Sequence, residues 1–89
     1  MDNRVREVRL TAGMTQEDLA AHVEVFRQTI HAVETGRYQP SLLLAFKLSI
    51  TLGIPVEDLF WLTESEETWL ARKPQVTSAQ IPRVRHRKS

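Results

Sequence analysis

The spacing of apolar residues predicts that the chain begins with a short helix. Val5, Val8 and Ala12 recur at intervals of three and four residues, as they do on one face of a helix. Asn3 can cap the first turn, and Gly13 can end the helix with a left-handed residue. We therefore expect a helix between these two residues.

The next two predicted helices are also short, and a tight turn joins them. Thr15 and Asp18 have the spacing of a capping box, which predicts a helix over residues 16–23. After the turn, a further helix is expected over residues 27–35, ended by Gly36. The residues expected to face the core are Leu19, Ala20 and Val23 in the first of these helices, and Ile30 and Val33 in the second.

The fourth predicted helix is the most hydrophobic. Pro40 breaks the preceding element, Ser41 can cap a new helix, and Gly53 ends it. Pro55 can open a further short helix that extends to Leu62. The stripe expected to face the core is Leu42, Ala45, Leu48, Ser49 and Leu52, joined by Leu59 and Phe60 of the following helix.

The helical pattern weakens after this point. Only the residues around Trp69 and Leu70 keep some helical character, and residues 74–89 are polar, basic and twice interrupted by proline, which predicts a flexible tail. No stretch before residue 60 alternates as a strand would. The sequence thus predicts an all-α bundle of five helices over residues 1–62, a C-terminal extension over residues 63–73, and a basic, disordered tail.

Composition narrows the class of protein. Eighty-nine residues with 42% hydrophobic and 26% charged content fit one small domain. The absence of cysteine excludes disulfides, thiol catalysis and cysteine-based zinc sites. The charged first turn is unlike a secretory signal, and the apolar run LLLAFKLSITLGIPV is shorter than the roughly 20 residues needed to span a bilayer. We expect a cytoplasmic protein without a membrane partner.

Charge is segregated along the chain. Residues 1–70 carry six basic and eleven acidic side chains, a net charge of −5, whereas residues 71–89 carry six basic side chains and no acidic one. An acidic body cannot rely on broad attraction to phosphate, so its contacts with a polyanion must be local. We expect the basic tail to add phosphate contacts, or only to raise solubility.

The pieces TQEDLA, RQTI, ETGR and LGIPVEDLF stand along residues 3–60 in a fixed order and spacing. In this respect the chain resembles the XRE family, which contains the phage repressor and Cro proteins and many small bacterial relatives. The resemblance implies a lambda-repressor-like helix-turn-helix domain in a sequence-specific transcriptional regulator, usually a dimer, that lays its third helix in the major groove of a double-stranded DNA operator. It also implies an ion pair between Arg9 and Glu34. We expect a repressor that is associated with the nucleoid when it is bound.

One face of the helix expected over residues 27–35 is free to read bases. At 100° per residue, Arg27, Gln28 and His31 lie opposite the apolar residues of this helix. Arginine can bond to O6 and N7 of guanine, and glutamine to N6 and N7 of adenine. Arg27 and Gln28 are therefore the first candidates for base contacts and His31 is the third. The alternative is that these side chains are merely solvated.

Contacts with the DNA backbone are expected at both ends of the helix-turn-helix, because helix N-termini and short polar side chains anchor phosphates. Thr15 can serve purely as a helix cap, or it can cap the helix and anchor a phosphate at the same time. Gln16 is therefore the better candidate for an anchor. The candidates that match the family pattern are Thr15 and Gln16 at the start of the second helix, with Thr35, Arg37, Tyr38 and Gln39 at the end of the third.

The turn departs from the family pattern at two positions. Glu24 stands where glycine is common, and a left-handed backbone there costs a residue with a side chain on the order of 1 kcal/mol. Phe26 replaces a Ser or Thr cap, which forgoes roughly 0.5–2 kcal/mol. A hydrophobic staple between Val25 and Ile30, and the Glu24 carboxylate near the start of the helix, can compensate. Phe26 has either a staple or core role or a contact with a thymine methyl group.

A second apolar stripe on the fourth helix is expected to form a dimer interface. The alternative is that the C-terminal segment of the same chain folds back and covers it. The candidate interface residues are Leu43, Phe46 and Ile50, joined by Trp61 and Trp69.

Two other functions fit the same fold. An antitoxin would repress its own operon while its C-terminal segment blocks a toxin protein, and a protein-interaction module would have kept the fold without binding DNA. An enzyme is not expected, because the sequence has no Gly-rich phosphate loop, no paired histidines and no carboxylate pair outside capping positions. We likewise expect no cofactor and no metal.

Overall fold

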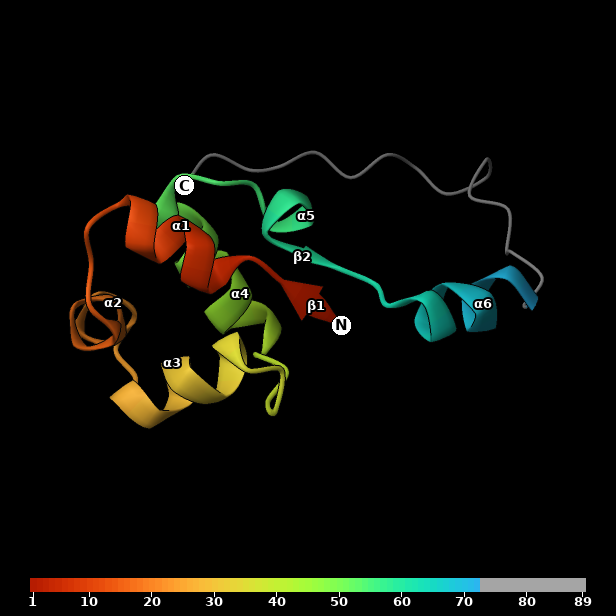
Figure 1. Cartoon of the computed structure of the whole chain (residues 1–89), viewed down its shortest axis with the longest axis horizontal. Coiled ribbons are helices and arrows are strands. Elements are labelled where there is room, and N and C mark those ends of the chain that lie inside the picture. Colours follow the sequence, from red (N-terminus) through yellow and green to blue (C-terminus); the bar gives the residue numbers. More distant parts are fainter. Residues whose placement is uncertain (73–89) are drawn as a thin grey trace.

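The computed structural model of the chain describes residues 1–72, so the tail expected over residues 74–89 lies outside the described part. Within that part the chain is mostly helical, which confirms the predicted fold class (Figure 1). The elements are β1 (Asp2–Asn3), α1 (Val5–Thr11), α2 (Gln16–Val23), α3 (Arg27–Glu34), α4 (Leu42–Leu52), α5 (Val56–Leu59), β2 (Phe60–Trp61) and α6 (Glu64–Arg72). No helix in residues 1–72 has the length and apolar content needed to cross a bilayer.

The first five helices surround a common apolar core, and α6 stands apart from them at the end of the extended β2 segment (Figure 1). Each of the five contributes to this core, and the side chains that are fully buried come from all of them: Val5, Leu19, Val23, Ile30, Val33, Leu48 and Leu59. The predicted inward residues of α2 and α3 are confirmed. In α1, however, Ala12 is exposed because the helix ends at Thr11.

The residues that α4 turns toward the core differ in part from the prediction. Leu42 is 71% exposed, whereas Leu44 is buried with Ala45 and Leu48. Apolar residues occupy most positions of this helix, so its periodicity does not fix which leucine of the first turn points inward. The bounds of α4 are as predicted: the Ser41 hydroxyl accepts the amide of Leu44 at 3.1 Å, and Gly53 ends the helix in the left-handed region.

A short β-pairing, which the sequence pattern did not predict, joins the two ends of the bundle. Asp2 and Asn3 pair antiparallel with Trp61 and Phe60, so α5 ends at Leu59 instead of continuing to residue 62. The Asn3 amide nitrogen also donates to the carbonyl of Val33 at 2.9 Å, which ties this pairing to the last turn of α3. The β1–β2 pairing thus fixes both the entry to α1 and the exit toward α6.

The start of α2 has the predicted capping box. The Thr15 hydroxyl accepts the amide of Asp18, and the Asp18 carboxylate accepts the amide of Thr15, each at 2.9 Å. These hydrogen bonds from Thr15 hold the pKa of Asp18 below its ordinary value. The capping role of Thr15 is therefore confirmed.

Candidate nucleic-acid interface

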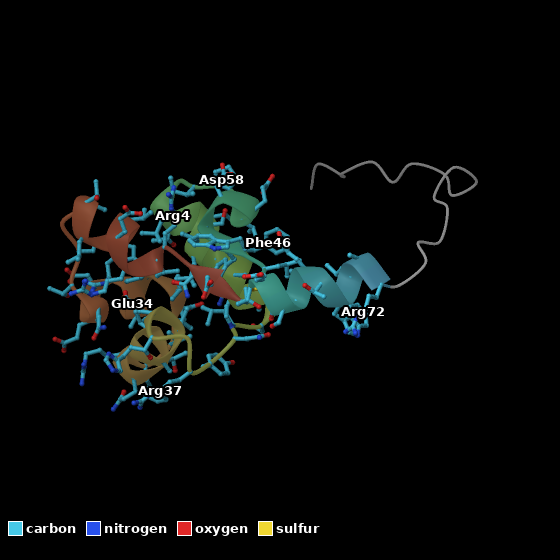
Figure 2. The ribbon with its side chains drawn as sticks, turned by 45° about the vertical axis from the view of Figure 1, so that its right-hand side comes forward. Arg4, Glu34, Arg37, Phe46, Asp58 and Arg72 are labelled. Atoms are coloured by element: carbon cyan, nitrogen blue, oxygen red, sulfur yellow. The ribbon has the colours of Figure 1, made fainter. Side chains whose placement is uncertain are left out.

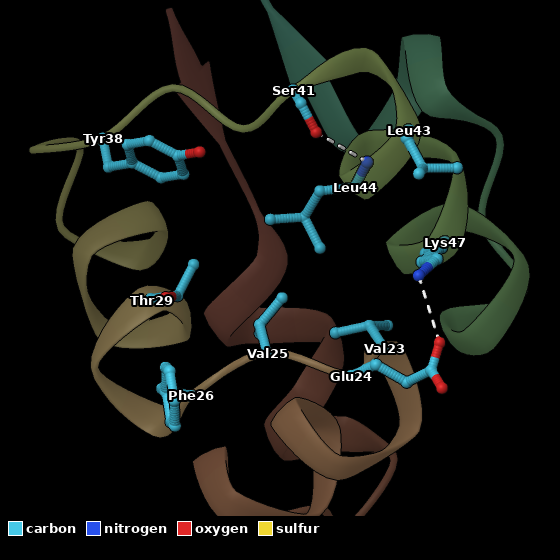
Figure 3. A pocket seen from close by; sticks show the side chains of 10 residues that line it. All are labelled: Val23, Glu24, Val25, Phe26, Thr29, Tyr38, Ser41, Leu43, Leu44 and Lys47. Atoms are coloured by element: carbon cyan, nitrogen blue, oxygen red, sulfur yellow. Dashed lines mark hydrogen bonds and ion pairs between the residues drawn. The ribbon is translucent and has the colours of Figure 1, made fainter.

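The turn between α2 and α3 contains a left-handed residue that has a side chain. Glu24 has φ 62° and ψ 46°, and within residues 1–72 it is the one non-glycine residue with positive φ. Its carboxylate does not lie at the start of α3, as the sequence suggested, but pairs with Lys47 of α4 at 3.2 Å (Figure 3). The turn is therefore fastened to α4 by an exposed ion pair.

Phe26 precedes the first residue of α3 and is 81% exposed, which rules out the core or staple role considered for it. It supplies no hydrogen bond to the amides of the first turn. Val25 instead is partly buried and packs against the core cluster to which Ile30 belongs. Phe26 and Tyr38 border an open hollow of about 380 Å³ between the turn and α4 (Figure 3).

The outward face of α3 carries the residues that the sequence singled out. Ile30 and Val33 are fully buried, while Arg27, Gln28 and His31 are exposed. These three side chains therefore lie on the solvent-facing side of the helix. The side chain of Gln28 forms no hydrogen bond within residues 1–72, so both the oxygen and the nitrogen of its amide are available to a ligand.

The side chain of Gln16, at the start of α2, joins this face to the interior. Its Oε1 accepts Arg27 Nη1 at 3.2 Å, and its Nε2 donates to Glu34 Oε1 at 3.0 Å. The same nitrogen lies 3.4 Å from His31 Nδ1. Gln16 thus contacts two of the three candidate base readers, a connection that sequence reasoning missed because the partners are 11 to 18 residues apart.

The buried end of this network is the ion pair implied by the family resemblance. Arg9 Nε lies 2.6 Å from Glu34 Oε2, and the two side chains are 7% and 1% exposed. Arg9 also donates from Nη2 to Glu34 Oε1 and from Nη1 to the carbonyl of Met14. The negative charge of Glu34 is therefore neutralised below the surface of α3.

The network sets the orientation of the Gln16 amide. A guanidinium only donates hydrogen bonds and a carboxylate only accepts them, so Oε1 must face Arg27 and Nε2 must face Glu34. The nitrogen then presents an N–H toward His31 Nδ1, which acts as the acceptor and leaves the proton of a neutral imidazole on Nε2. His31 therefore offers a donor to solvent, and purine N7 is an acceptor in the major groove.

The C-terminal end of α3 carries the other backbone candidates. The Thr35 hydroxyl donates to the carbonyl of His31 at 2.9 Å, and the amides of Arg37 and Tyr38 both donate to the carbonyl of Ala32. Arg37, Tyr38 and Gln39 are all exposed just beyond the helix. The structure therefore brings these candidates to the same end of α3.

Five of the eleven acidic side chains of the body lie on α5 and α6. Glu57 and Asp58 lie on α5, and Glu64, Glu66 and Glu67 lie on α6. In Figure 2, Asp58 and Arg37 stand at opposite ends of the domain. Part of the negative charge of the body thus lies away from the end of α3 that precedes Arg37 (Figure 2).

The candidate dimer residues are exposed, and α6 does not cover them. No residue of α6 is buried, and its axis leads away from the domain (Figures 1 and 2). Folding back of this described segment over α4 is therefore not observed. The exposed fractions are 65% for Leu43, 49% for Phe46, 79% for Ile50, 44% for Trp61 and 52% for Trp69. Within residues 1–72 there is also no group of three His, Asp or Glu side chains that could hold a metal ion.

Comparison with known proteins gives concordant matches. The family model described as helix-turn-helix matches residues 5–59. An uncharacterized HTH-type transcriptional regulator of Bacillus subtilis, YgzD, is 48% identical over 64 residues, which are 72% of this chain and 97% of the relative.

Two solved structures share the fold. The restriction-modification controller protein C.AhdI from Aeromonas hydrophila is similar with a TM-score of 0.61 and 37% identity, over 64% of this chain and 86% of the other. A hypothetical transcription factor from Neisseria, NHTF, is similar with a TM-score of 0.60 and 29% identity, over 78% of this chain and 76% of the other.

Proposed function

Because the chain belongs to the helix-turn-helix family and is an HTH-type transcriptional regulator that binds DNA, we propose that it is a repressor that lays α3 in the major groove of its operator. The observation that carries this proposal is the outward face of α3. Arg27 and His31 are held there by Gln16, and Gln28 is free to bond. Arg27 reads guanine, Gln28 reads adenine, and His31 donates from Nε2 to a purine.

The flanking residues set the position of α3 on the duplex. The positive end of α2, with Thr15 and Gln16, and the segment after α3 with Thr35, Arg37, Tyr38 and Gln39 contact phosphates. Gln16 can do so while it holds Arg27, because a helix start offers backbone amides as well as its side chain. Phe26 stands beside this face and contacts a thymine methyl group.

The repressor acts as a homodimer. A single short α3 reads too few bases for a specific site, whereas two copies read half-sites about one helical turn, or 34–36 Å, apart. The exposed apolar residues of α4 support such an association, because a patch of this kind on a small domain marks an interaction surface. A protein bound over a promoter then excludes the polymerase.

An in vitro binding-site selection with the full chain tests DNA reading. Arg27→Ala should weaken binding to the selected site roughly 5- to 150-fold, as expected for one bidentate contact of about 1–3 kcal/mol, and should relax preference at one base position. The matched control is Arg6→Ala, which removes the same charge from the exposed surface of α1. Equal losses in both variants, with unchanged base preference, would refute base reading by Arg27.

Transcription from a promoter that overlaps the selected site tests the repressor role separately. The protein should reduce transcription in proportion to occupancy. An increase in transcription would overturn repression while leaving DNA reading intact.

A further inference from the structure

A row of hydrogen bonds leads from the interior of the domain to the reading face of α3. Arg9 only donates, so both oxygens of the Glu34 carboxylate accept from it, at 2.6 and 3.2 Å. Glu34 Oε1 also accepts from Gln16 Nε2 at 3.0 Å. The same nitrogen carries a second hydrogen and lies 3.4 Å from His31 Nδ1. These four residues form a relay of hydrogen bonds from the buried ion pair to an imidazole on the surface.

The buried end of the relay fixes the direction of its hydrogen bonds. The side chain of Glu34 is 1% exposed, so solvent supplies no alternative partner for it. An ionised carboxylate offers only acceptors, whereas the side-chain amide of Gln16 has an acceptor oxygen and a donor nitrogen. Glu34 therefore takes the nitrogen of Gln16 and leaves the oxygen for Arg27, which donates to it at 3.2 Å.

The proton of His31 follows from that orientation. An amide nitrogen only donates, so Nδ1 accepts and the proton of a neutral imidazole lies on Nε2. In the major groove guanine presents only acceptors, N7 and O6, whereas cytosine presents only the N4 donor. An imidazole that donates from Nε2 is therefore suited to guanine, and one that accepts at Nε2 is suited to cytosine.

We infer that Glu34 is a specificity-determining residue that acts on DNA without touching it. Its carboxylate fixes the amide of Gln16, the amide fixes the proton of His31, and the proton selects guanine over cytosine at the base that His31 faces. This role rests on the proposed function, in which α3 lies in the major groove. Glu34 is thus a positioning residue, and it acts through two hydrogen bonds.

Glu34→Gln reverses the relay while it keeps the shape of the side chain. The shorter bond from Arg9, made by Nε at 2.6 Å, requires an oxygen, so the new amide turns its nitrogen toward Gln16. Gln16 then presents its oxygen to position 34 and to His31, which draws the imidazole proton to Nδ1. The preference should change from guanine to cytosine at one base pair, by roughly 2- to 12-fold for one hydrogen bond. Arg27 loses its acceptor in the same variant.

The double variant Gln16→Glu/Glu34→Gln separates the two effects and keeps the total charge. A carboxylate at position 16 accepts from the amide at position 34, from Arg27 and from the imidazole. The proton of His31 therefore remains on Nδ1, while Arg27 regains its acceptor. This variant should retain the cytosine preference at the base that His31 faces and recover the guanine preference of Arg27. A purely structural loss at position 34 would weaken both preferences and reverse neither.

Nuclear magnetic resonance of the free protein observes the imidazole proton directly. Long-range correlation of ring hydrogens with ring nitrogens, at a mildly alkaline pH that keeps an imidazole neutral, distinguishes the protonated nitrogen from the bare one. His22 is an internal reference of the opposite kind, because its Nδ1 lies 2.8 Å from the carbonyl oxygen of Asp18 and must donate to it. His31 should carry its proton on Nε2 in the unmodified chain and on Nδ1 in Glu34→Gln, while His22 stays unchanged.

Base preference is measured by binding-site selection with the full chain, after thermal unfolding has shown which variants are folded. The control Glu17→Gln removes an exposed carboxylate of α2 outside the relay, and should change neither the imidazole proton nor the selected site. A proton on Nδ1 of His31 in the unmodified chain would overturn the inference, even if Glu34→Gln does not fold. A folded Glu34→Gln chain with an unchanged proton position or an unchanged base preference would also overturn it.

The two measurements keep the relay apart from the proposed function. An unmodified chain that selects no DNA site would refute the proposed function. The resonance measurement needs no DNA, so it still decides whether Glu34 controls the proton of His31.

Discussion

The left-handed turn residue allows a direct test of the geometry that joins α2 to α3. Glu24 has φ 62°, and a non-glycine residue in this region costs roughly 1–2 kcal/mol. Glycine removes this cost but loses about 0.5–1 kcal/mol through its greater freedom in the unfolded chain. Glu24→Gly should therefore be more stable than Glu24→Ala by about 1 kcal/mol, or a Tm about 4–8 °C higher for a domain of this size.

The comparison between these two variants isolates the backbone term, since both lose the ion pair with Lys47. That pair is exposed and contributes about 0.2–1 kcal/mol, so Glu24→Ala should fall below the unmodified chain while Glu24→Gly should equal or exceed it. The assay is thermal and urea unfolding at neutral pH, with unchanged m values as the sign that the unfolded state is comparable.

Gly53 offers the reverse control. It has φ 71°, and a Cβ built there meets no atom within 4 Å, so Gly53→Ala should lose stability through the backbone alone. If Glu24→Gly proves no more stable than Glu24→Ala, while Gly53→Ala is destabilised, residue 24 does not adopt the left-handed conformation in solution and the reasoning fails.

Three further changes probe the core, the caps and the reading face. Arg9→Met should lower the free energy of unfolding by about 3–5 kcal/mol, because it leaves the Glu34 carboxylate buried without its partner; a melting temperature near that of the unmodified chain would contradict a buried pair. Since Thr15 lowers the pKa of Asp18, this carboxylate stabilises the fold above its ordinary pKa, and the contribution disappears as the pH falls through the lowered value. Asp18→Asn should therefore reduce the loss of thermal stability on acidification, and an unchanged pH profile would argue against the capping box. Phe26→Ser should raise stability by about 0.5–2 kcal/mol by supplying a cap oxygen, and should weaken preference for T at one operator position; a selection that returns the same site would exclude the thymine contact.

The sequence predicted the bounds of α2 and the residues it buries, because the capping residue, the apolar stripe and the following turn all indicate the same short helix. It also located the strained position at Glu24. It could not orient the first turn of α4, since leucine stands at 42, 43 and 44 and the choice depends on the packing of the other helices. Local periodicity supplies no information about such a choice.

Two other features depend on contacts between distant residues. The β1–β2 pairing involves only two residues on each side, too few for an alternating pattern, and it joins positions separated by most of the domain. The contacts of Gln16 depend on how α2 crosses α3. The sequence correctly marked this residue as a candidate anchor on DNA, but its bonds to Arg27 and Glu34 follow only from the packing of the two helices.

The bonds made by Gln16 also bear on how the specificity of such a regulator can diverge. The residue at position 27 must donate a hydrogen bond to Gln16 Oε1, and the residue at position 34 must accept hydrogen bonds from both Gln16 and Arg9. A change at either position therefore disturbs a shared network. Gln28 and Phe26 are exposed, and neither side chain takes part in this hydrogen-bond network within the described chain. Paralogues that acquire new operators can vary these two positions one mutation at a time, whereas a new residue at position 27 calls for a compensating change at position 16.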